Sequence, residues 1–466
     1  MSAMQNIKKM FVLMLENRSY DNLFGWSDLR GWTPGGVATA ADGLVGKPTF
    51  QVADAHGHSY PVGQGAPYRL NFDPGHEFTD TLVQLCGPVN AGPWLPGIRD
   101  DSAMLANGDY PPLAADGNST GFGYDLDTYG YDVATALRCF TPDQVPVLNF
   151  LAQQFAICDR WFSSMPGPTW PNRFFALAGT SWGLDHSPSG GNSVAATLFD
   201  GAKYGDGSDS LLTRLAPHDW LVAHGDTPQA WALEGADTAP QNFVVHTDLF
   251  SMLAAEKVDA SFIFIEPTYD PLSNFRNGQS MHPCGDVRNG EKLVADVYNA
   301  ILQSPYWEQS LLLIVFDEHG GFFDHVLPDP SHVHGMPPLA PAAPTPLTKH
   351  GFRFDRYGCR VPAIVVSPYI KQATIDHTFY DHLSIAKTLS RIVQPAKVPL
   401  LDQPRFASAA DLSPILTLSQ PRKSTEMHPC PPALPVAQPS TVATLNRTAT
   451  AFSNLNWPIH SIYSGA

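Results

Sequence analysis

Basic side chains are scarce in this sequence of 466 residues. Lys and Arg together number 28 against 44 for Asp and Glu, which gives a formal net charge of -16 at pH 7. Proteins that bind nucleic acids without sequence preference need clustered Lys and Arg to neutralise phosphates. The charge balance therefore argues against a nucleic-acid partner.

Long apolar runs and paired cysteines are missing as well. No apolar stretch reaches the roughly 20 residues that a membrane-spanning helix needs, so no transmembrane segment is expected, while peripheral contact with a membrane is left open. The six cysteines include no CxxC pair, which argues against zinc-ribbon and thioredoxin-like sites. Their even number permits disulfides without requiring them.

The N-terminal apolar stretch lacks the features of a signal peptide. It runs directly into Glu16 without a small-residue cleavage site, which favours a first β-strand. We expect a soluble protein that is cytoplasmic as written, or secreted or periplasmic if a signal has been removed. The sequence leaves the oligomeric state open.

Common cofactor and nucleophile motifs are also absent. There is no GxGxxG after a strand and no GxxxxGK[ST], so a nucleotide-binding site has no support. There is no GxSxG elbow, which argues against an ordinary α/β-hydrolase.

Short apolar blocks that end abruptly in polar residues are the main structural signal. Segments with helical spacing lie between or after them, and strands that alternate with helices are typical of a parallel sheet. The pattern predicts an α/β fold with a mostly parallel central sheet flanked by helices. The predicted strands are 10–15, 262–265, 311–316 and 361–366, and the predicted helices are 146–155, 289–303 and 379–392.

We predict one large α/β domain at residues 1–400, with long insertions. The segments 26–138 and 328–356 are rich in Gly or Pro, show little periodicity and are expected to be elaborated loops, the second of them a surface excursion. Residues 401–466 are rich in Pro, Ser and Thr and are expected to form an irregular C-terminal wrap or tail.

Two polar pairs follow predicted buried strands. Glu16 and Asn17 come after the first strand, and Asp317 and Glu318 after a later one. Ligands of open α/β sheets bind outside the carboxyl ends of the strands. Three carboxylates and an amide oxygen form a hard ligand set that favours Ca²⁺, Mg²⁺ or Mn²⁺, with Zn²⁺ less natural. The alternative is that Glu16 caps a turn and that the later pair binds backbone donors or an arginine.

Thr169 is the candidate nucleophile. Pro166 and Pro168 exclude a helix before it, and Pro171 favours the first turn of a helix after it. The free N–H groups of a helix N-terminus would face whatever binds there, as in phosphate sites. The alternative is an ordinary threonine N-cap.

Four histidines lie in polar surroundings rich in Gly or Pro. They could hold phosphoryl oxygens or protonate a leaving group, although a single loop histidine is more often a surface residue. These histidines are His76, His224, His282 and His319.

Four segments together resemble the bacterial phosphoesterase family of phospholipases C and broad-specificity acid phosphatases, within the alkaline phosphatase superfamily. Plant non-specific phospholipases C are similar. The resemblance runs in order from about residue 8 to residue 389. It is carried by ENRSYDNLFG (Glu16–Gly25), PGPTWPNRFF (Pro166–Phe175), HPCGDVRNGE (His282–Glu291) and DEHGGFFDHV (Asp317–Val326).

The resemblance implies a role for each matching residue. Glu16, Asn17, Asp317 and Glu318 match metal ligands, and Thr169 matches a nucleophile that also touches the metal. Asn17, His76 and His282 match the phosphate pocket, His224 matches less clearly, and His319 belongs to the motif beside the ligands. The sequence departs from the common pattern at Asn22, where many members carry His.

The expected activity is metal-assisted hydrolysis of a phosphoric ester through a phosphothreonine intermediate. The resemblance favours a phospholipase C-type phosphodiesterase acting on phospholipids, and a broad-specificity acid phosphatase is the alternative. A binding protein of the same fold without catalytic activity is a third hypothesis. It has less support because Thr169 and both acidic pairs are present.

Overall fold

The computed structural model describes residues 3–91, 111–188, 203–205, 207–328, 347–393, 400–401 and 404–436. The chain divides into two compact units, Met1–Leu434 and Pro435–Ala466. The helices and strands described below all belong to the first unit.

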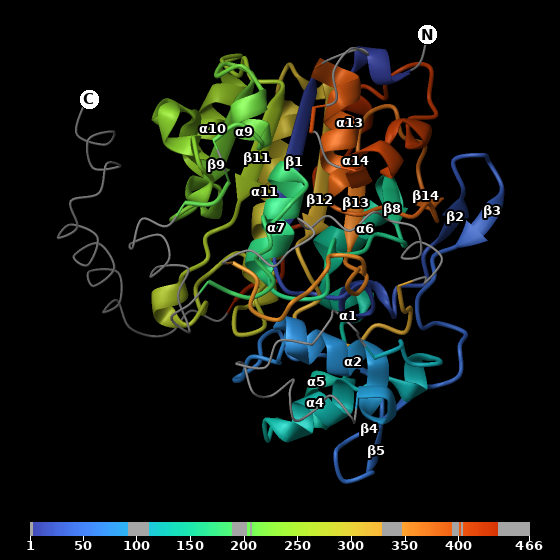
Figure 1. The fold of residues 1–466 in the computed structure, drawn as a ribbon. Helices are drawn as coiled ribbons and strands as arrows, with labels where there is room; N and C mark the ends of the chain where they lie inside the picture. The colour runs from blue at the N-terminus through green and yellow to red at the C-terminus, as the bar shows by residue number, and fades with distance from the viewer. Residues whose placement is uncertain are drawn as a thin grey trace. The chain divides into compact units, whose positions relative to one another are not determined.

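A ten-stranded sheet forms the centre of the first unit (Figure 1). The pairs β12–β13, β13–β8 and β2–β3 are antiparallel, and the other six pairs of neighbours are parallel. The prediction of a mostly parallel α/β sheet is confirmed. In spatial order the strands are β10 (Phe243–Val245), β9 (Trp220–His224), β11 (Phe262–Glu266), β1 (Lys9–Leu15), β12 (Ser310–Phe316), β13 (Ala363–Val366), β8 (Ala156–Cys158), β14 (Thr374–Asp376), β2 (Arg30–Trp32) and β3 (Ala38–Ala40).

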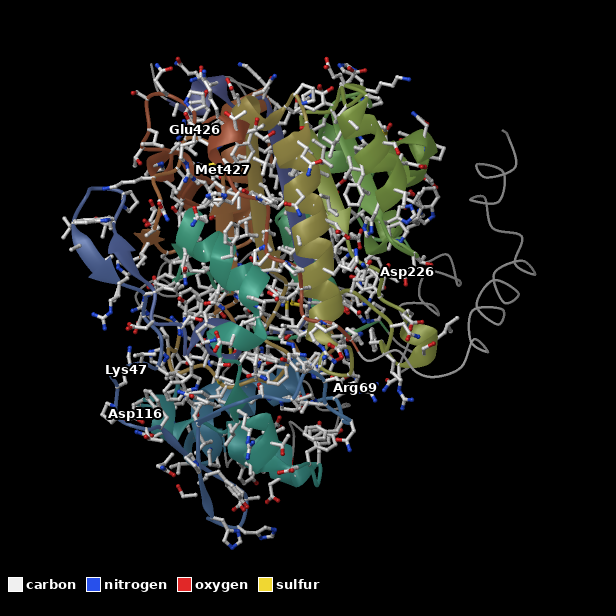
Figure 2. The ribbon with its side chains drawn as sticks, turned by 180° about the vertical axis from the view of Figure 1, so that it is seen from behind. Lys47, Arg69, Asp116, Asp226, Glu426 and Met427 are labelled. Carbon is white, nitrogen blue, oxygen red and sulfur yellow. The ribbon has the colours of Figure 1, made fainter. Side chains whose placement is uncertain are left out.

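Helices cover both faces of the sheet, which explains the continuous apolar runs of its central strands. Every residue of β1 and β12 is buried, as expected for strands covered on both sides. The helices α7 (Thr169–Ala178) and α13 (Leu383–Val393) pack together on the face turned to the viewer in Figure 1. Figure 2 shows the opposite face, with α6 (Pro146–Gln154), α10 (His246–Ala254) and α11 (Val287–Gln303).

The three predicted helices are present, with shifted starts where an aspartate caps them. Asp286 accepts the N–H of Arg288, and α11 therefore begins at Val287, two residues earlier than predicted. Asp381 accepts the N–H of Leu383, and α13 begins at Leu383, later than predicted.

The expectation that residues 26–138 are mainly loops is wrong. This segment, here called the insertion, forms α2 (Phe78–Ala91), α4 (Phe122–Thr128), α5 (Val133–Ala136), the hairpin of β4 (Gln51–Ala53) and β5 (Ser59–Pro61), and β6 (Gly63–Gln64), which pairs with β7 (Arg138–Cys139). A kink at Gly87 and a proline at position 88 interrupt α2, and they hide its helical pattern from the sequence. Figure 1 shows α2, α4 and α5 gathered at the end of the sheet where β1 ends.

The chain after the sheet packs back on it in the described part, 404–436. Helix α14 (Pro404–Ser408) carries Arg405, whose Nη1 donates to the carbonyl of Ser164 at 2.9 Å. Further on, the carbonyls of Arg422 and His428 accept hydrogen bonds from Trp307 and Tyr298. The predicted excursion at 328–356 lies mostly outside the described residues.

The structure bears on two points that concern the cysteines and membrane-spanning helices. All six cysteines are buried and free, so no disulfide forms among them. Among the described residues, no helix combines the length and the apolar character that crossing a bilayer requires.

Candidate active site

The two acidic pairs meet at the edge of the sheet where β1 and β12 end. These strands are parallel neighbours, and Leu15 pairs with Phe316, so the residues that follow them emerge side by side. The backbone N–H of Asn17 donates to Asp317 Oδ1 at 3.1 Å, and its side-chain amide contacts Glu318 Oε1. Glu16, Asn17, Asp317 and Glu318 are at most 2% exposed.

Thr169 reaches the same point from the other side. It is the first residue of α7, as the sequence predicted, and its Oγ1 lies 3.1 Å from Asn17 Nδ2. Pro168 occupies the N-cap position without a side-chain cap, so the alternative of an ordinary threonine N-cap is wrong. The side chain of Asn172 fixes the loop before the helix by bonding to Met165 and Gly167. The threonine hydroxyl is therefore presented to the strand ends by an anchored helix start.

Left-handed backbone occurs in both segments where the strand ends meet. Asn17 has φ 61° and Gly320 has φ 65°, both in the left-handed region. A Cβ atom added at Gly320 would lie 2.2 Å from the carbonyl oxygen of Asn17. The conformation is strained only at Asn17, which has a Cβ atom, and such strain concentrates at functional sites, whereas glycine adopts it freely.

Arg173 is a site residue that the sequence reasoning missed. It lies one turn after Thr169 on α7, and its Nε donates to Asp317 Oδ2 at 2.9 Å. Its Nη2 donates to the carbonyls of Met14 and Leu15 at 3.1 Å each. Asp317 therefore contacts both an arginine and a backbone donor, the partners that the alternative named. Arg173 joins the helix that carries Thr169 to the ends of both strands.

The oxygen cluster still lacks partners after Arg173 is counted. Glu16 Oε1 and Asn17 Oδ1 are buried and accept no hydrogen bond from the described residues. Burial raises the pKa of Glu16 to about 8 despite Arg173, and burial likewise raises the pKa of Asp317 to about 6. Buried oxygens that are short of positive charge are the donor set of a hard divalent cation, so the residues present fit such an ion.

His76 and His282 face each other beside this cluster. Their ring centroids are 6.4 Å apart, and Asp73 lies between them, 3.5 Å from His282 Nε2 and 3.9 Å from His76 Nδ1. His282 stacks on Phe275 with 3.6 Å between ring centroids. The two predicted phosphate-pocket histidines thus form one pair.

The pair differs in charge. Burial disfavours the charged form of His76, but the carboxylates of Glu318 and Asp73 outweigh it and raise its pKa to about 10. Burial, together with the positive charges of His76 and Arg18, lowers the pKa of His282 well below 6.5. At neutral pH one ring is a cation and the other is neutral.

The other two predicted histidines differ in their relation to the acidic cluster. His224 is the last residue of β9, which β11 separates from β1, and strand spacing places it about 10 Å from β1. It contacts the carbonyl of Asp226, labelled in Figure 2, and burial lowers its pKa. The structure does not bring His224 to the strand ends of β1 and β12. His319 is fully buried, with Nδ1 3.4 Å from Glu318 Oε2.

Two other groups of carboxylate, imidazole or thiol side chains have ligand atoms within 4.8 Å of one another, in the described part of the chain. One comprises Asp73, His282 and Cys284. In it, His282 Nδ1 already accepts the backbone N–H of Cys284 at 3.2 Å. That bond uses the lone pair of Nδ1, so this group is a weaker candidate for a metal site.

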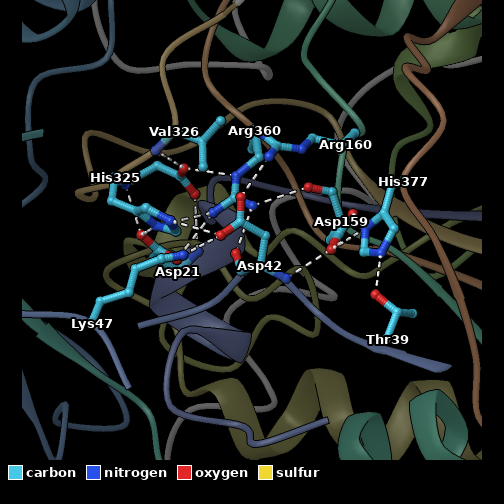
Figure 3. Close-up of polar contacts among 11 residues, drawn as sticks. Asp21, Thr39, Asp42, Lys47, Asp159, Arg160, His325, Val326, Arg360 and His377 are labelled. Atoms are coloured by element: carbon cyan, nitrogen blue, oxygen red, sulfur yellow. Dashed lines mark hydrogen bonds and ion pairs between the residues drawn. The ribbon is translucent and has the colours of Figure 1, made fainter. Parts of the chain in front are cut away.

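The second group comprises Asp21, Asp324 and His325, and a guanidinium fills its centre (Figure 3). Arg360 donates to Asp324 at 2.8 Å and to Asp21 at 3.1 Å. His325 adds contacts to Asp21 at 2.7 Å and to Asp42 at 3.2 Å. The carboxylates already have their counter-charge, and the group ties the insertion to the start of the chain.

Comparison with known proteins defines the class. A model of the Phosphoesterase family matches residues 7–394. The chain therefore belongs to the Phosphoesterase family, and it is a phosphoric ester hydrolase.

Individual relatives agree with this class. The chain is 32% identical to non-specific phospholipase C6 of Arabidopsis thaliana over 93% of its own length and 76% of the relative's. It is 27% identical to phospholipase C B of Mycobacterium tuberculosis over 96% and 86% of the two chains. Among solved structures, a protein in the alkaline phosphatase superfamily from Vibrio parahaemolyticus matches 56% of this chain and 63% of its own, with 15% identity and a TM-score of 0.32.

Proposed function

We propose that this protein is a metal-dependent phosphodiesterase of the phospholipase C type that acts through a phosphothreonine intermediate. The observation that carries the proposal is the meeting of Thr169 with both acidic strand ends, through the contact of 3.1 Å between Thr169 Oγ1 and Asn17 Nδ2. The names of the relatives, which are phospholipases C from plants and bacteria, favour a phospholipid substrate over a simple monoester.

Glu16, Asn17, Asp317 and Glu318, together with Thr169, would hold one divalent cation. Ca²⁺, Mg²⁺ and Mn²⁺ suit these oxygen ligands best, and Zn²⁺ is less suited. When bound, such an ion lowers the pKa of a coordinated hydroxyl and neutralises charge on a phosphoryl oxygen. His319 lies behind Glu318 and supports this ligand rather than the substrate.

Thr169 is the nucleophile. Its hydroxyl loses its proton to solvent, and the oxygen attacks phosphorus in line with the leaving alcohol. The P–O bond to that alcohol breaks, and the phosphoryl group, which still carries the head group, remains on Thr169 Oγ1. Water then attacks phosphorus from the side that the alcohol left, and its proton goes to His76, which became neutral when it protonated the alcohol. The bond between phosphorus and Thr169 Oγ1 breaks, and the phosphorylated head group is released. Arg173 keeps the helix start in register with the strand ends throughout.

The two histidines take different roles because their charges differ. His76 is protonated at neutral pH, and its Nδ1–H donates to the carbonyl of Pro74 at 2.7 Å, so its Nε2–H is the proton for the departing alkoxide. His282 is neutral and accepts the N–H of Cys284 at Nδ1, so its Nε2 carries a hydrogen that binds a phosphoryl oxygen. We assign no catalytic role to His224.

The test compares Thr169→Ala with Thr169→Ser. Serine keeps a hydroxyl at the helix start and should retain turnover of a choline-phosphate chromogenic ester, whereas alanine should remove it while the circular dichroism spectrum stays unchanged. Turnover near wild type in a folded Thr169→Ala variant would remove Thr169 from the mechanism. A parallel assay with an aryl phosphate decides between diester and monoester substrates.

A further inference from the structure

Gln84, a fully buried residue of α2 in the insertion, reaches the acidic cluster through His319. Its Nε2 donates to the carbonyl of Gly75 at 2.7 Å and to Asp125 Oδ2 at 2.8 Å. Its Oε1 lies 2.6 Å from His319 Nε2. Both amide hydrogens face acceptors, so the amide has only one orientation that satisfies its partners, with the oxygen toward the histidine.

This orientation decides which ring nitrogen of His319 carries a hydrogen. Because Gln84 Oε1 only accepts hydrogen bonds, His319 Nε2 must donate. Nδ1 then lies 3.4 Å from Glu318 Oε2 and forms no hydrogen bond, so the ring contacts this carboxylate by packing. Phe122 of α4 packs against the same ring, edge to face, with centroids 6.0 Å apart. The insertion thus fixes both the tautomer and the orientation of the ring.

Glu318 shows what this arrangement does. Its Oε2 also accepts the backbone N–H of Gly320 at 2.6 Å, while its Oε1 points to Asn17, on the side of Thr169. The hydrogen bond from Gly320 therefore holds the rear oxygen, and the His319 ring packs behind it without a hydrogen bond at Nδ1. The front oxygen contacts the Asn17 side chain and faces the proposed ion. Partners of this kind orient metal ligands in proteins.

We propose that Gln84 is a positioning residue that sets the cation affinity of the site by holding His319 against Glu318. The proposal rests on the proposed function, since it assumes that Glu318 is a ligand. It assigns the insertion a role in catalysis: α2 supplies Gln84 and α4 supplies Asp125, so docking of these helices and cation binding are coupled.

The test measures binding of Mn²⁺ to the full-length protein from the electron paramagnetic resonance signal of the free ion. In Gln84→Met, which keeps the size of the side chain and removes its hydrogen bonds, affinity for Mn²⁺ should fall about 10- to 100-fold. Excess Mn²⁺ should restore most of the turnover, a rescue that general destabilisation would not show. If Gln84→Met does not fold, Gln84→Asn carries the same prediction, because its shorter amide cannot reach His319.

A double variant and a control sharpen the result. Gln84→Glu places a second carboxylate against that of Asp125, and the repulsion between them should lower the affinity for Mn²⁺. In the double variant with Asp125→Asn, the asparagine amide can donate a hydrogen bond to the new carboxylate. The affinity for Mn²⁺ should then return toward that of wild type. Gln144→Met removes a partly buried amide contact, that of Nε2 with the carbonyl of Ala66 at 2.9 Å, away from His319. It should leave Mn²⁺ affinity unchanged.

Two outcomes separate this inference from the proposed function. If wild type binds Mn²⁺ and Gln84→Met binds it equally well, the positioning role of Gln84 is wrong and the proposed function stands. The cation site itself is wrong if wild type binds no Mn²⁺, or if the Mn²⁺ that it binds is still bound by Asp317→Asn. The proposed role of Gln84 is then wrong as well.

Discussion

At the scale of single residues, the site depends on side chains whose buried charges are compensated from distant parts of the chain. Arg173 is the clearest example. It lies 144 residues from Asp317 in the sequence and supplies the guanidinium that the strand ends share. Removal of one partner from a buried ion pair leaves the other charge uncompensated, which costs about 3–5 kcal/mol.

We therefore expect Arg173→Met to lower the free energy of unfolding by about 3–5 kcal/mol and to abolish turnover. Arg160→Met is the matched control. It removes an arginine whose 2.6 Å ion pair with Asp42 is partly exposed, and such pairs contribute about 1 kcal/mol or less. Urea unfolding of both variants, with activity measured on the folded fraction, gives the comparison. Equal losses in the two variants would contradict the role of Arg173.

The acidic pairs could be predicted from the sequence, whereas Arg173 and Gln84 could not. Glu16 and Asp317 each follow an apolar run, and parallel strands bring their carboxyl ends to one edge, so a local pattern was sufficient. The partners of Arg173 and Gln84 depend on how a helix is rotated over the sheet or docked beside it. No local pattern carries that information.

At the scale of elements, the turn after β12 sets the distance between the strand ends. Gly320 and Gly46 both have positive φ, 65° and 79°, but only Gly320 lies against another segment, the carbonyl of Asn17. Left-handed backbone costs a residue with a Cβ atom about 1–2 kcal/mol. Gly46→Ala should show this cost alone, because nothing lies within 4 Å of the added atom.

Gly320→Ala should lower the free energy of unfolding by more than Gly46→Ala does, and it should also abolish turnover, because the strand ends must move apart. Thermal unfolding and hydrolysis of the choline-phosphate ester test both expectations. Full activity in Gly320→Ala would show that the site tolerates a wider gap.

The contact between α6 and α11 predicts a pH dependence. Glu291 of α11 accepts the N–H groups of Leu148 at 2.8 Å and Val147 at 3.2 Å, at the start of α6. Burial outweighs these bonds and raises the pKa of Glu291 from 4.5 to about 7. The folded state therefore binds a proton more tightly than the unfolded state does.

The protonated Glu291 side chain should make its full contribution to the free energy of unfolding below about pH 4.5. That contribution should be lost as the pH rises through about 7. Between pH 4.5 and pH 8, the free energy of unfolding of wild type should fall by on the order of 3 kcal/mol relative to that of Glu291→Gln, because glutamine stays neutral over this range. Urea unfolding at several pH values measures the difference. Parallel stability curves for the two proteins would contradict it.

Elements were predictable where one pattern governs a whole segment. The buried strands β1 and β12 and the amphipathic helix α11 follow such patterns. The helices of the insertion could not be predicted in this way, because they are short or kinked. They pack around a hydrophobic cluster that includes Leu85, Phe122 and Leu126.

At the scale of the whole molecule, the segment after the sheet is part of the fold. Arg405, Arg422 and His428 contact the core, although the sequence placed the domain boundary near residue 400. Truncation after residue 400 should give a protein that unfolds at lower temperature, because buried contacts of Arg405 and Phe406 are removed. Equal melting temperatures would place the boundary at 400 instead.

The central claim is that the phosphoryl group is transferred twice, first to Thr169 and then to water. The stereochemistry at phosphorus tests it most directly, with a phosphorothioate diester of known configuration hydrolysed in isotopically labelled water. Two in-line displacements predict retention of configuration in the product. Inversion would mean a single attack by water, and it would contradict the phosphothreonine intermediate.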